Sequence, residues 1–358
     1  MLDIANLERD ALESALSERG HKRFHARQVF RWLYKRGVTD VAAMTDLSRD
    51  LRAAIAGEFT IATPAIVTRE RSVDGTEKFL LRLADGLQLE SVFIPDTPSM
   101  TFCISTQVGC AMACAFCLTG KMGLVRNLTA GEIAGQVRVL AGALDMRDKK
   151  FNIVLMGMGE PLHNYDETMR ALRILNDEHG FAMSPRRVTL STVGLLPALE
   201  KMAREPIMPN LAISLHAPTD QLRGELVPLN RKYGVADIIA ACKRFPLTKR
   251  SRITFEYVLL AGVNDSPDDA RKLARLLSGV KSKVNVIPLN AAPGIPFERP
   301  SDRTIDDFAQ ILSERGLIVS VRKSRGRDIR AACGQLIVDG QKQSPGQKLA
   351  SVISLQPS

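Results

Sequence analysis

The sequence lacks the features that would place the protein in a membrane or outside the cell. No apolar run approaches the roughly 18–20 residues that a helix needs to cross a bilayer. The first eight residues contain neither the basic start nor the apolar stretch of a secretory signal. Internal repeats and low-complexity tracts are also absent, which excludes repeat architectures. We therefore expect a cytoplasmic protein with no membrane partner.

A disulfide framework is excluded by the same expectation, because thiols stay reduced in the cytosol. The chain nevertheless has six cysteines, so each is either a small buried side chain or a chemical group. Three of them, Cys110, Cys114 and Cys117, fall within eight residues. Three cysteines so close together are more typical of a reactive or ligand-binding site than of small buried side chains.

A fourth ligand is missing from this triplet, and its absence is informative. Thiolates bind iron–sulfur clusters, and three cysteines leave one iron of a [4Fe-4S] cube open. That iron can chelate the amino and carboxylate groups of S-adenosylmethionine, whose cleavage then yields a 5′-deoxyadenosyl radical. Structural zinc needs four ligands, usually as two separated pairs, and no second pair exists. The spacing C-x3-C-x2-C therefore predicts a [4Fe-4S] cluster, with zinc or inert thiols as the alternatives.

Acidic residues are fewer than basic ones. The 358 residues include 49 Lys and Arg against 39 Asp and Glu, which gives a net charge of +10 and a pI near 9.5. This excess favours a polyanionic partner, usually nucleic acid, although a basic protein without such a partner is equally compatible. The apolar fraction of 45% is ordinary for a globular protein.

Hydrophobic periodicity divides the chain into zones. Apolar residues recur at helical spacing over 7–58, and the basic residues there fit either a solvated face or RNA contact. Short strands separated by Asp74-Gly75 and Asp85-Gly86 turns follow. Strands then alternate with helices, as in a parallel sheet covered by helices. We expect a helical RNA-binding accessory domain (1–58), an antiparallel β adaptor (59–98), a catalytic core (99–340) and a loose tail (341–358).

The core contains six strand–helix units, fewer than the eight that close a TIM barrel. We therefore expect an α/β fold with a partial, open (β/α)6 TIM-like barrel, whose active site lies at the C-terminal strand ends. Helices are expected between most strands, for example over 129–145 and 165–179. The predicted strands are 101–106, 151–157, 187–192, 210–215, 252–260 and 283–288.

Polar and small residues follow several of these strands. A continuous apolar strand ends in Gly157-Met-Gly159-Glu160-Pro161, where glycines let the backbone approach a ligand and Glu160 suits a methionine ammonium. A plain glycine turn explains this stretch equally well when it is considered alone. The shared placement at strand ends favours a cofactor site. The other candidates, each weak individually, are Ser191, Ser214, His216 and Asn290.

Two further cysteines lie outside the triplet. Five basic residues within nine positions, Arg322 to Arg330, precede Cys333, and such a mixture suits phosphate binding. The positive field there favours a thiolate. Cys103 lies on the first barrel strand, seven residues before Cys110. Each of the two cysteines can also be read as a small buried residue.

Together these stretches resemble the RlmN/Cfr family of radical-SAM RNA methyltransferases. The similarity covers about residues 90–335 and is looser in the N-terminal region. There the chain has Lys22-Arg23-Phe24-His25, whereas the family has Lys-Pro-Phe-Arg. The matching stretches are Gln107 to Cys117, Arg126-Asn127-Leu128, Gly157 to Pro161, Leu211 to Pro218, Arg322 to Gly326 and Ala332-Cys333-Gly334.

The resemblance implies an activity and its partners. The expected reaction is methylation of adenine carbon 2 in 23S rRNA, at the peptidyl-transferase centre, and in tRNA 3′ to the anticodon. Two molecules of S-adenosylmethionine are consumed per turnover, and a flavodoxin-type donor supplies electrons to a monomer. Carbon-8 methylation, as in Cfr, is the alternative that the motifs leave open. A zinc-holding RNA binder and a radical-SAM enzyme acting on a protein or small molecule are two competing hypotheses.

The resemblance also implies residue roles. Cys110, Cys114 and Cys117 hold the cluster. Cys333 carries the methyl group, Cys103 resolves the covalent intermediate and Glu90 is the base. The residues implied for the S-adenosylmethionine site are Gly159, Glu160, Ser191, Ser214, Leu215, His216 and Asn290.

Overall fold

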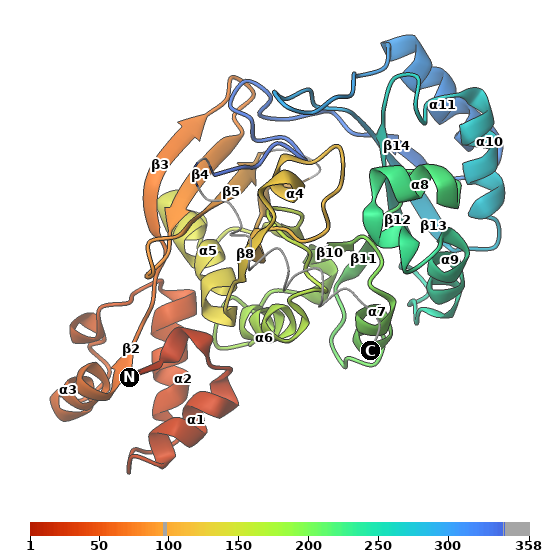
Figure 1. The fold of residues 1–358 in the computed structure, drawn as a ribbon. Coiled ribbons are helices and arrows are strands. Elements are labelled where there is room, and N and C mark those ends of the chain that lie inside the picture. Colours follow the sequence, from red (N-terminus) through yellow and green to blue (C-terminus); the bar gives the residue numbers. More distant parts are fainter. Residues whose placement is uncertain (96–98, 339, 341–358) are drawn as a thin grey trace.

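A single ten-stranded sheet organises the computed structural model, which describes residues 1–95, 99–338 and 340. The strand order is β14-β13-β12-β11-β10-β9-β6-β5-β4-β3, and the run from β6 to β14 is parallel throughout. The two ends of this order are not paired with each other, so the barrel is open (Figure 1). The parallel strands are β6 (Thr101–Cys103), β9 (Asn152–Leu155), β10 (Val188–Thr192), β11 (Asn210–Ser214), β12 (Ile253–Leu259), β13 (Ser282–Pro288) and β14 (Val319–Val321).

Helices follow these strands and cover the outside of the sheet (Figure 1). Side-chain caps fix where several of them begin. Thr129 and Glu132 form a capping box at the start of one helix, and Ser266 caps another ahead of a proline. The covering helices are α5 (Ala130–Ala143), α6 (Tyr165–Asn176), α7 (Leu196–Met202), α8 (Asp220–Leu226), α9 (Val235–Arg244), α10 (Pro267–Leu276) and α11 (Asp302–Glu314).

The antiparallel strands β3 (Ala65–Arg71), β4 (Glu77–Arg82) and β5 (Gln88–Ile94) continue the same sheet, because β5 pairs with β6. Both predicted turns are present. The backbone is left-handed at Gly75 and Gly86, with φ of +82° and +85°, which suits glycine. The predicted adaptor is thus the end of the core sheet.

The N-terminal region contains α1 (Arg9–Ser17), α2 (His25–Phe30) and α3 (Arg49–Glu58), in agreement with the predicted helical spacing. It is attached to α5 by hydrogen bonds. The Asn6 side chain accepts the Gly131 N–H at 2.9 Å, and the Arg138 guanidinium donates to the Ala62 carbonyl at 2.9 Å. The Tyr34 hydroxyl donates to the Ala5 carbonyl within the region itself.

The open α/β barrel that the sequence predicts is confirmed, with all six predicted strands in place. A seventh parallel strand, β14, was not predicted. Another addition is a small antiparallel sheet formed by β7 (Gln107–Gly109) and β8 (Leu124–Asn127) beside the cysteine triplet. The predicted tail 341–358 lies outside the described residues. Within the described parts of the chain, no helix combines the length and apolarity needed to cross a membrane.

Candidate active site

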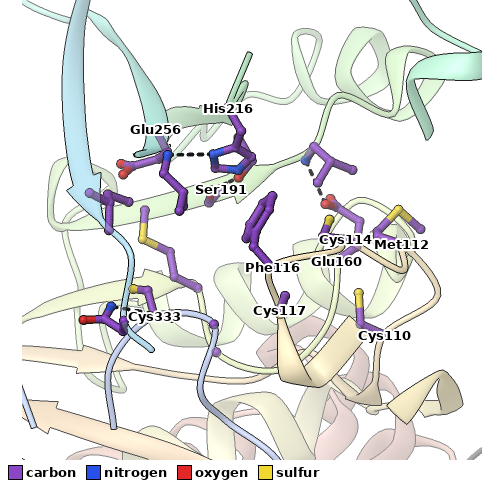
Figure 2. A pocket seen from close by; sticks show the side chains of 18 of the residues that line it. Cys110, Met112, Cys114, Phe116, Cys117, Glu160, Ser191, His216, Glu256 and Cys333 are labelled. Atoms are coloured by element: carbon purple, nitrogen blue, oxygen red, sulfur yellow. Dashed lines mark hydrogen bonds between the residues drawn. The ribbon is translucent and has the colours of Figure 1, made fainter. Parts of the chain in front are cut away.

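A cavity opens at the C-terminal ends of the parallel strands, where the barrel predicts a site (Figure 2). Its wall combines residues that are far apart in the sequence. In Figure 2, Cys333 lies across the cavity from Cys110 and Cys114, with Phe116 and Cys117 between them. The predicted site residues in this wall are Cys110, Cys114, Cys117, Gly159, Glu160, Ser191, Ser214, His216, Asn290 and Cys333.

The cysteine triplet occupies a loop between β7 and α4 (Leu118–Met122). The loop is closed by the Cys110 N–H, which donates to the Gly123 carbonyl at 3.0 Å. Burial raises the pKa of the Cys110 and Cys114 thiols, and the neighbouring cysteines of the triplet raise it further. Two buried thiols and the half-buried Cys117 thiol, which repel one another as thiolates, are suited to a cationic iron cluster, which deprotonates its ligands.

Within the described residues, no three His, Cys, Asp or Glu side chains are placed to hold one metal ion. In a [4Fe-4S] cube each thiolate binds a different iron, so its ligands surround a wider group than one ion.

Glu160 is held by backbone donors rather than by a charged partner. Its carboxylate accepts the Val193 N–H at 2.9 Å and the Leu162 N–H at 3.0 Å. Burial raises the pKa of Glu160 to about 7 despite these hydrogen bonds. The predicted carboxylate is therefore in the cavity wall, fixed in orientation.

Gly157 and Gly159 line the cavity, and they also allow close packing behind it. A Cβ on Gly157 would lie 2.7 Å from the Ile104 carbonyl oxygen, and one on Gly159 would lie 2.7 Å from the Gln107 Cβ. The loop after β9 can therefore pack against the segment that leads to the cysteine triplet only with glycine at these positions.

His216 has a defined tautomer. Its Nδ1 accepts the Val258 N–H at 3.0 Å, so the ring proton is on Nε2. Burial lowers the pKa of His216 to about 3, helped by the Arg223 cation. The residue adopts a φ of +62°, unusual for a non-glycine residue, and its ring stands edge-on to Phe116 at 4.7 Å between centroids. It is a neutral ring fixed beside the cysteine loop.

Polar side chains from three strands complete this side of the cavity. The hydroxyls of Ser191 on β10 and Ser214 on β11 are 3.2 Å apart. Asn290, which follows β13, donates to the Cys333 carbonyl at 3.4 Å. The other Asn290 side-chain atom, Oδ1, is buried and has no hydrogen-bond partner among the described residues. Buried amide oxygens are rarely left unpaired, so this atom indicates a missing ligand.

Cys103 and Cys333 meet in an adjoining cavity, which shares Met156, Asn290 and Cys333 with the first. Burial and the neighbouring Cys333 raise the pKa of the Cys103 thiol to about 12. The predicted pair of non-cluster cysteines is therefore brought together by the fold. Arg322 also lines both cavities.

The segment carrying Cys333 is bonded directly to the cysteine triplet's own helix. The Leu118 N–H donates to the Gly334 carbonyl at 2.8 Å, and the Thr119 hydroxyl donates to the Leu336 carbonyl at 2.6 Å. Both donors immediately follow Cys117. These bonds fix the distance between the predicted cluster and the predicted methyl carrier.

Two predicted site residues lie outside both cavity walls. Leu215 is fully buried, its N–H donates to the Glu256 carbonyl, and its own carbonyl accepts from Arg223. Glu90 lies on β5, where its carboxylate accepts the Ile337 N–H at 2.9 Å and pairs with Lys78 at 3.2 Å. Burial raises the pKa of Glu90 against the opposing effect of Lys78.

Sequence reasoning missed three charged residues of this region. Arg322 was counted only among the phosphate-binding basic residues, yet Cys333 and Glu256 beside it raise its pKa. Glu256 is buried on β12 and lines the cavity, and a lone acid in an otherwise apolar strand is the signal that could have found it. Arg223 is fully buried on α8, and no sequence signal distinguishes it from a surface arginine.

Comparisons with known proteins agree with this site. The sequence model of the radical SAM superfamily matches residues 104–277, and that of the ribosomal RNA large subunit methyltransferase N-terminal domain matches residues 2–61. A Geobacter sulfurreducens protein named dual-specificity RNA methyltransferase RlmN is 50% identical over 336 residues, covering 94% of this chain and 92% of that protein. The protein of the same name from Rhodospirillum rubrum is 47% identical over 350 residues, covering 96% and 82%.

A solved structure is similar over nearly the whole chain. The crystal structure of a radical SAM methyltransferase from Sphaerobacter thermophilus matches with a TM-score of 0.90 and 48% sequence identity, covering 94% of this chain and 99% of that one. Identity at this level over both domains identified by the sequence models is decisive. The chain belongs to the RlmN family of radical-SAM RNA methyltransferases.

Proposed function

We propose that this protein methylates carbon 2 of a specific adenine in 23S rRNA, at the peptidyl-transferase centre, and of the adenine 3′ to the anticodon in tRNA. The observation that carries the proposal is the shared cavity wall formed by the cysteine triplet and Cys333. The adjoining cavity, where Cys333 meets Cys103, supports the same activity.

The chemistry of adenine explains why a second reactive cysteine is needed. Carbon 2 lies between two ring nitrogens and is electron-poor, so it does not attack a sulfonium methyl group. A carbon radical can add to it. Cys110, Cys114 and Cys117 would hold the cluster, and the unpaired Asn290 oxygen, Glu160 and the two serines would hold S-adenosylmethionine. When bound, these two groups supply a methyl group and a 5′-deoxyadenosyl radical.

The chain's own residues carry the carbon from thiol to ring. Cys333 holds the methyl carbon on its sulfur and presents it to the adenine after one hydrogen atom is lost. The ring adduct gives up one electron, which the cluster, when bound, would accept, and Glu90, whose raised pKa suits proton acceptance, takes the proton that leaves the ring. The Cys103 thiol then attacks the Cys333 sulfur and a disulfide forms. The bond from the Cys333 sulfur to carbon breaks with its electron pair left on the carbon, and the proton released by the Cys103 thiol completes the methyl group. A transient disulfide of this kind is compatible with a reducing compartment.

The remaining expectations stay part of this proposal. RNA substrates are the reason to expect a cytoplasmic protein. A flavodoxin-type reductant and a monomeric state are proposed from the family. Two molecules of S-adenosylmethionine are consumed, one as methyl donor and one as radical source.

The product is tested by anaerobic incubation of the cluster-loaded protein with S-adenosylmethionine, reductant and ribosomal or transfer RNA. Mass spectrometry of nucleosides is expected to show 2-methyladenosine together with 5′-deoxyadenosine. Label on carbon 8 would overturn the proposed position while leaving the radical machinery intact. Absence of both products from a cluster-loaded protein would overturn the function.

The roles of the two non-cluster cysteines give a sharper test. Cys103→Ala is expected to trap a covalent protein–RNA adduct through Cys333, because nothing then cleaves the bond between sulfur and product. Cys333→Ala is expected to give no adduct. Cys242→Ala is the matched control, since Cys242 is a buried cysteine on α9 away from both cavities. Denaturing gels report the adduct, and equal amounts from Cys103→Ala and Cys333→Ala would contradict the assignment.

A further inference from the structure

The turn between β3 and β4 is bonded to the segment that carries Cys333, although some 250 residues separate them in sequence. The Ser72 hydroxyl donates to Asp328 Oδ1 at 2.5 Å, and the Val73 N–H donates to Asp328 Oδ2 at 3.2 Å. The Gly326 N–H donates to Asp74 Oδ2 at 2.9 Å. We call these five residues the clasp.

The hairpin side of the clasp is rigid. The other oxygen of Asp74 accepts the Thr76 N–H at 2.9 Å, and the Gly75 N–H donates to the Ser72 carbonyl at 3.0 Å. One carboxylate therefore closes its own turn and holds Gly326 at the same time. A β-hairpin anchored in a ten-stranded sheet is a firm support for a loop.

The two sides also interlock sterically. Gly326 has a left-handed backbone, with φ of +63°, and a Cβ there would lie 2.9 Å from the Thr76 Cγ2 and 2.6 Å from the Ala331 Cβ. The Ala331 N–H donates to the Gly326 carbonyl at 2.8 Å. The hairpin therefore restrains Gly326 directly, and the hydrogen bond between Gly326 and Ala331 extends this restraint to the residues just before Cys333.

The acids of the clasp remain charged without neutralising the basic segment. Burial opposes ionisation of Asp74, but the hydrogen bonds from Gly326 and Thr76 lower its pKa below the ordinary value. The hydrogen bond from Ser72 likewise lowers the pKa of Asp328. Both carboxylates accept from N–H and O–H groups. Among the residues that the structure describes, no ion pair involves Lys323, Arg325, Arg327 or Arg330.

We infer that the clasp sets the register of Cys333 during methyl transfer, with Ser72, Asp74 and Asp328 as positioning residues. Asn290 and α4 hold the segment at Cys333 and just after it, and the clasp holds the part before it. The basic segment, Arg322 to Arg330, would bind RNA phosphates. The distance between those phosphates and the Cys333 sulfur then stays fixed. This inference rests on the proposed function, because it assigns Cys333 the role of methyl carrier.

The first test is amide hydrogen exchange on the full-length, cluster-loaded protein. Asp328→Ala removes the acceptor for both Ser72 and Val73, and we expect exchange in a peptide spanning 323–334 to rise about tenfold. Asp328→Asn, which keeps one oxygen for Ser72, is expected to restore part of the protection. Peptides from α10 should be unchanged.

The matched control is Asp85→Ala in the neighbouring turn, where Asp85 accepts the Leu87 N–H at 3.0 Å just as Asp74 accepts the Thr76 N–H. It alters an equivalent hairpin turn without touching the clasp. Equal exchange in Asp85→Ala and Asp328→Ala would overturn the inference.

The second test separates positioning from general damage. With Cys333 out of register, radical formation continues while transfer fails, so Asp328→Ala should raise the ratio of 5′-deoxyadenosine to methylated adenine about tenfold. Simple unfolding would lower both products together and leave this ratio unchanged, which would contradict positioning. If wild-type protein made no methylated adenine, the proposed function would fail, whereas the exchange experiment would still decide whether the clasp exists.

Discussion

At the scale of single residues, the cavity is built from buried polar groups whose partners are backbone atoms. Glu160 and His216 both accept main-chain N–H groups, and neither has a charged partner. Such groups are fixed in place by the strands that carry them. They therefore give this part of the cavity wall a fixed shape.

His216 gives a prediction about pH and stability. Its folded pKa of about 3 lies below the ordinary value of 6.5, so below pH 6.5 the unfolded chain binds a proton that the folded chain does not. The free energy of unfolding should fall as the pH is lowered through 6.5, by up to about 1.4 kcal/mol per pH unit from this group. His216→Gln should reduce the fall in Tm between pH 7.5 and 5.5, measured anaerobically. An unchanged difference would contradict a buried neutral ring.

The residues of the site differ in how far sequence can identify them. The cysteine triplet was recognisable because three ligands of one loop show their spacing in the sequence itself. Cys333 was recognisable from its basic neighbours. Arg322 and Glu256 were not assigned to the cavity, because their contacts join strands that are distant in sequence. Leu215 was included only through the resemblance, and the structure puts its side chain in the core.

At the scale of elements, one buried arginine joins α8 to two strand ends. Arg223 donates to the carbonyls of Leu215 at 3.0 Å, Ser214 at 3.1 Å and Val193 at 2.6 Å. Burial lowers its pKa to about 10, so it remains charged at neutral pH. The loops after β10 and β11 thus share one cationic centre, which fixes the part of the cavity wall that these loops form.

Loss of this centre should destabilise the protein strongly. Arg223→Ala leaves three carbonyls without their donor and opens a cavity, so we expect the free energy of unfolding to fall by roughly 3 kcal/mol or more. Arg244→Ala is the control, because Arg244 forms an exposed ion pair with Glu200 at 3.6 Å and should contribute less than about 1 kcal/mol. Urea unfolding measures both. Similar losses in the two variants would refute the role of Arg223.

The elements themselves were largely predictable. Long apolar or periodic stretches gave the six core strands and the main helices, because their burial imposes a pattern on the sequence. β14 escaped prediction because it is three residues long and mostly exposed, with no such pattern. β7 (Gln-Val-Gly) and β8 (Leu-Val-Arg-Asn) escaped prediction because neither contains a run of apolar residues longer than two.

At the scale of the whole molecule, the N-terminal helices are joined to the barrel through a close approach at α5. A Cβ on Gly131 would lie 2.7 Å from the Ala5 carbonyl carbon and 2.8 Å from the Asn6 side-chain oxygen. Only glycine allows the first residues to reach the start of this helix. The position of the N-terminal helices relative to the cavity therefore depends on residue 131 being glycine.

Gly131→Ala should loosen this attachment while leaving the core intact. We expect the overpacking to cost about 1–3 kcal/mol and to speed chymotryptic cleavage after Phe59, between α3 and β3. Gly57→Ala, a helical glycine in α3 with open space around it, is the control and should not speed cleavage. Iron content should stay at the wild-type level in both. Equal cleavage of the two variants would show that the close approach is unimportant.

The late position of Cys333 has a consequence for how the protein is made. The ribosome releases the chain from its N-terminus, so the cysteine triplet, α5 and β9 emerge long before the segment that bonds to Leu118 and Thr119. During that interval the cavity lacks one wall. The side of the cavity that this segment forms is therefore open until the segment emerges and docks. Docking closes the cavity and places Cys333 in one wall with the cysteine triplet.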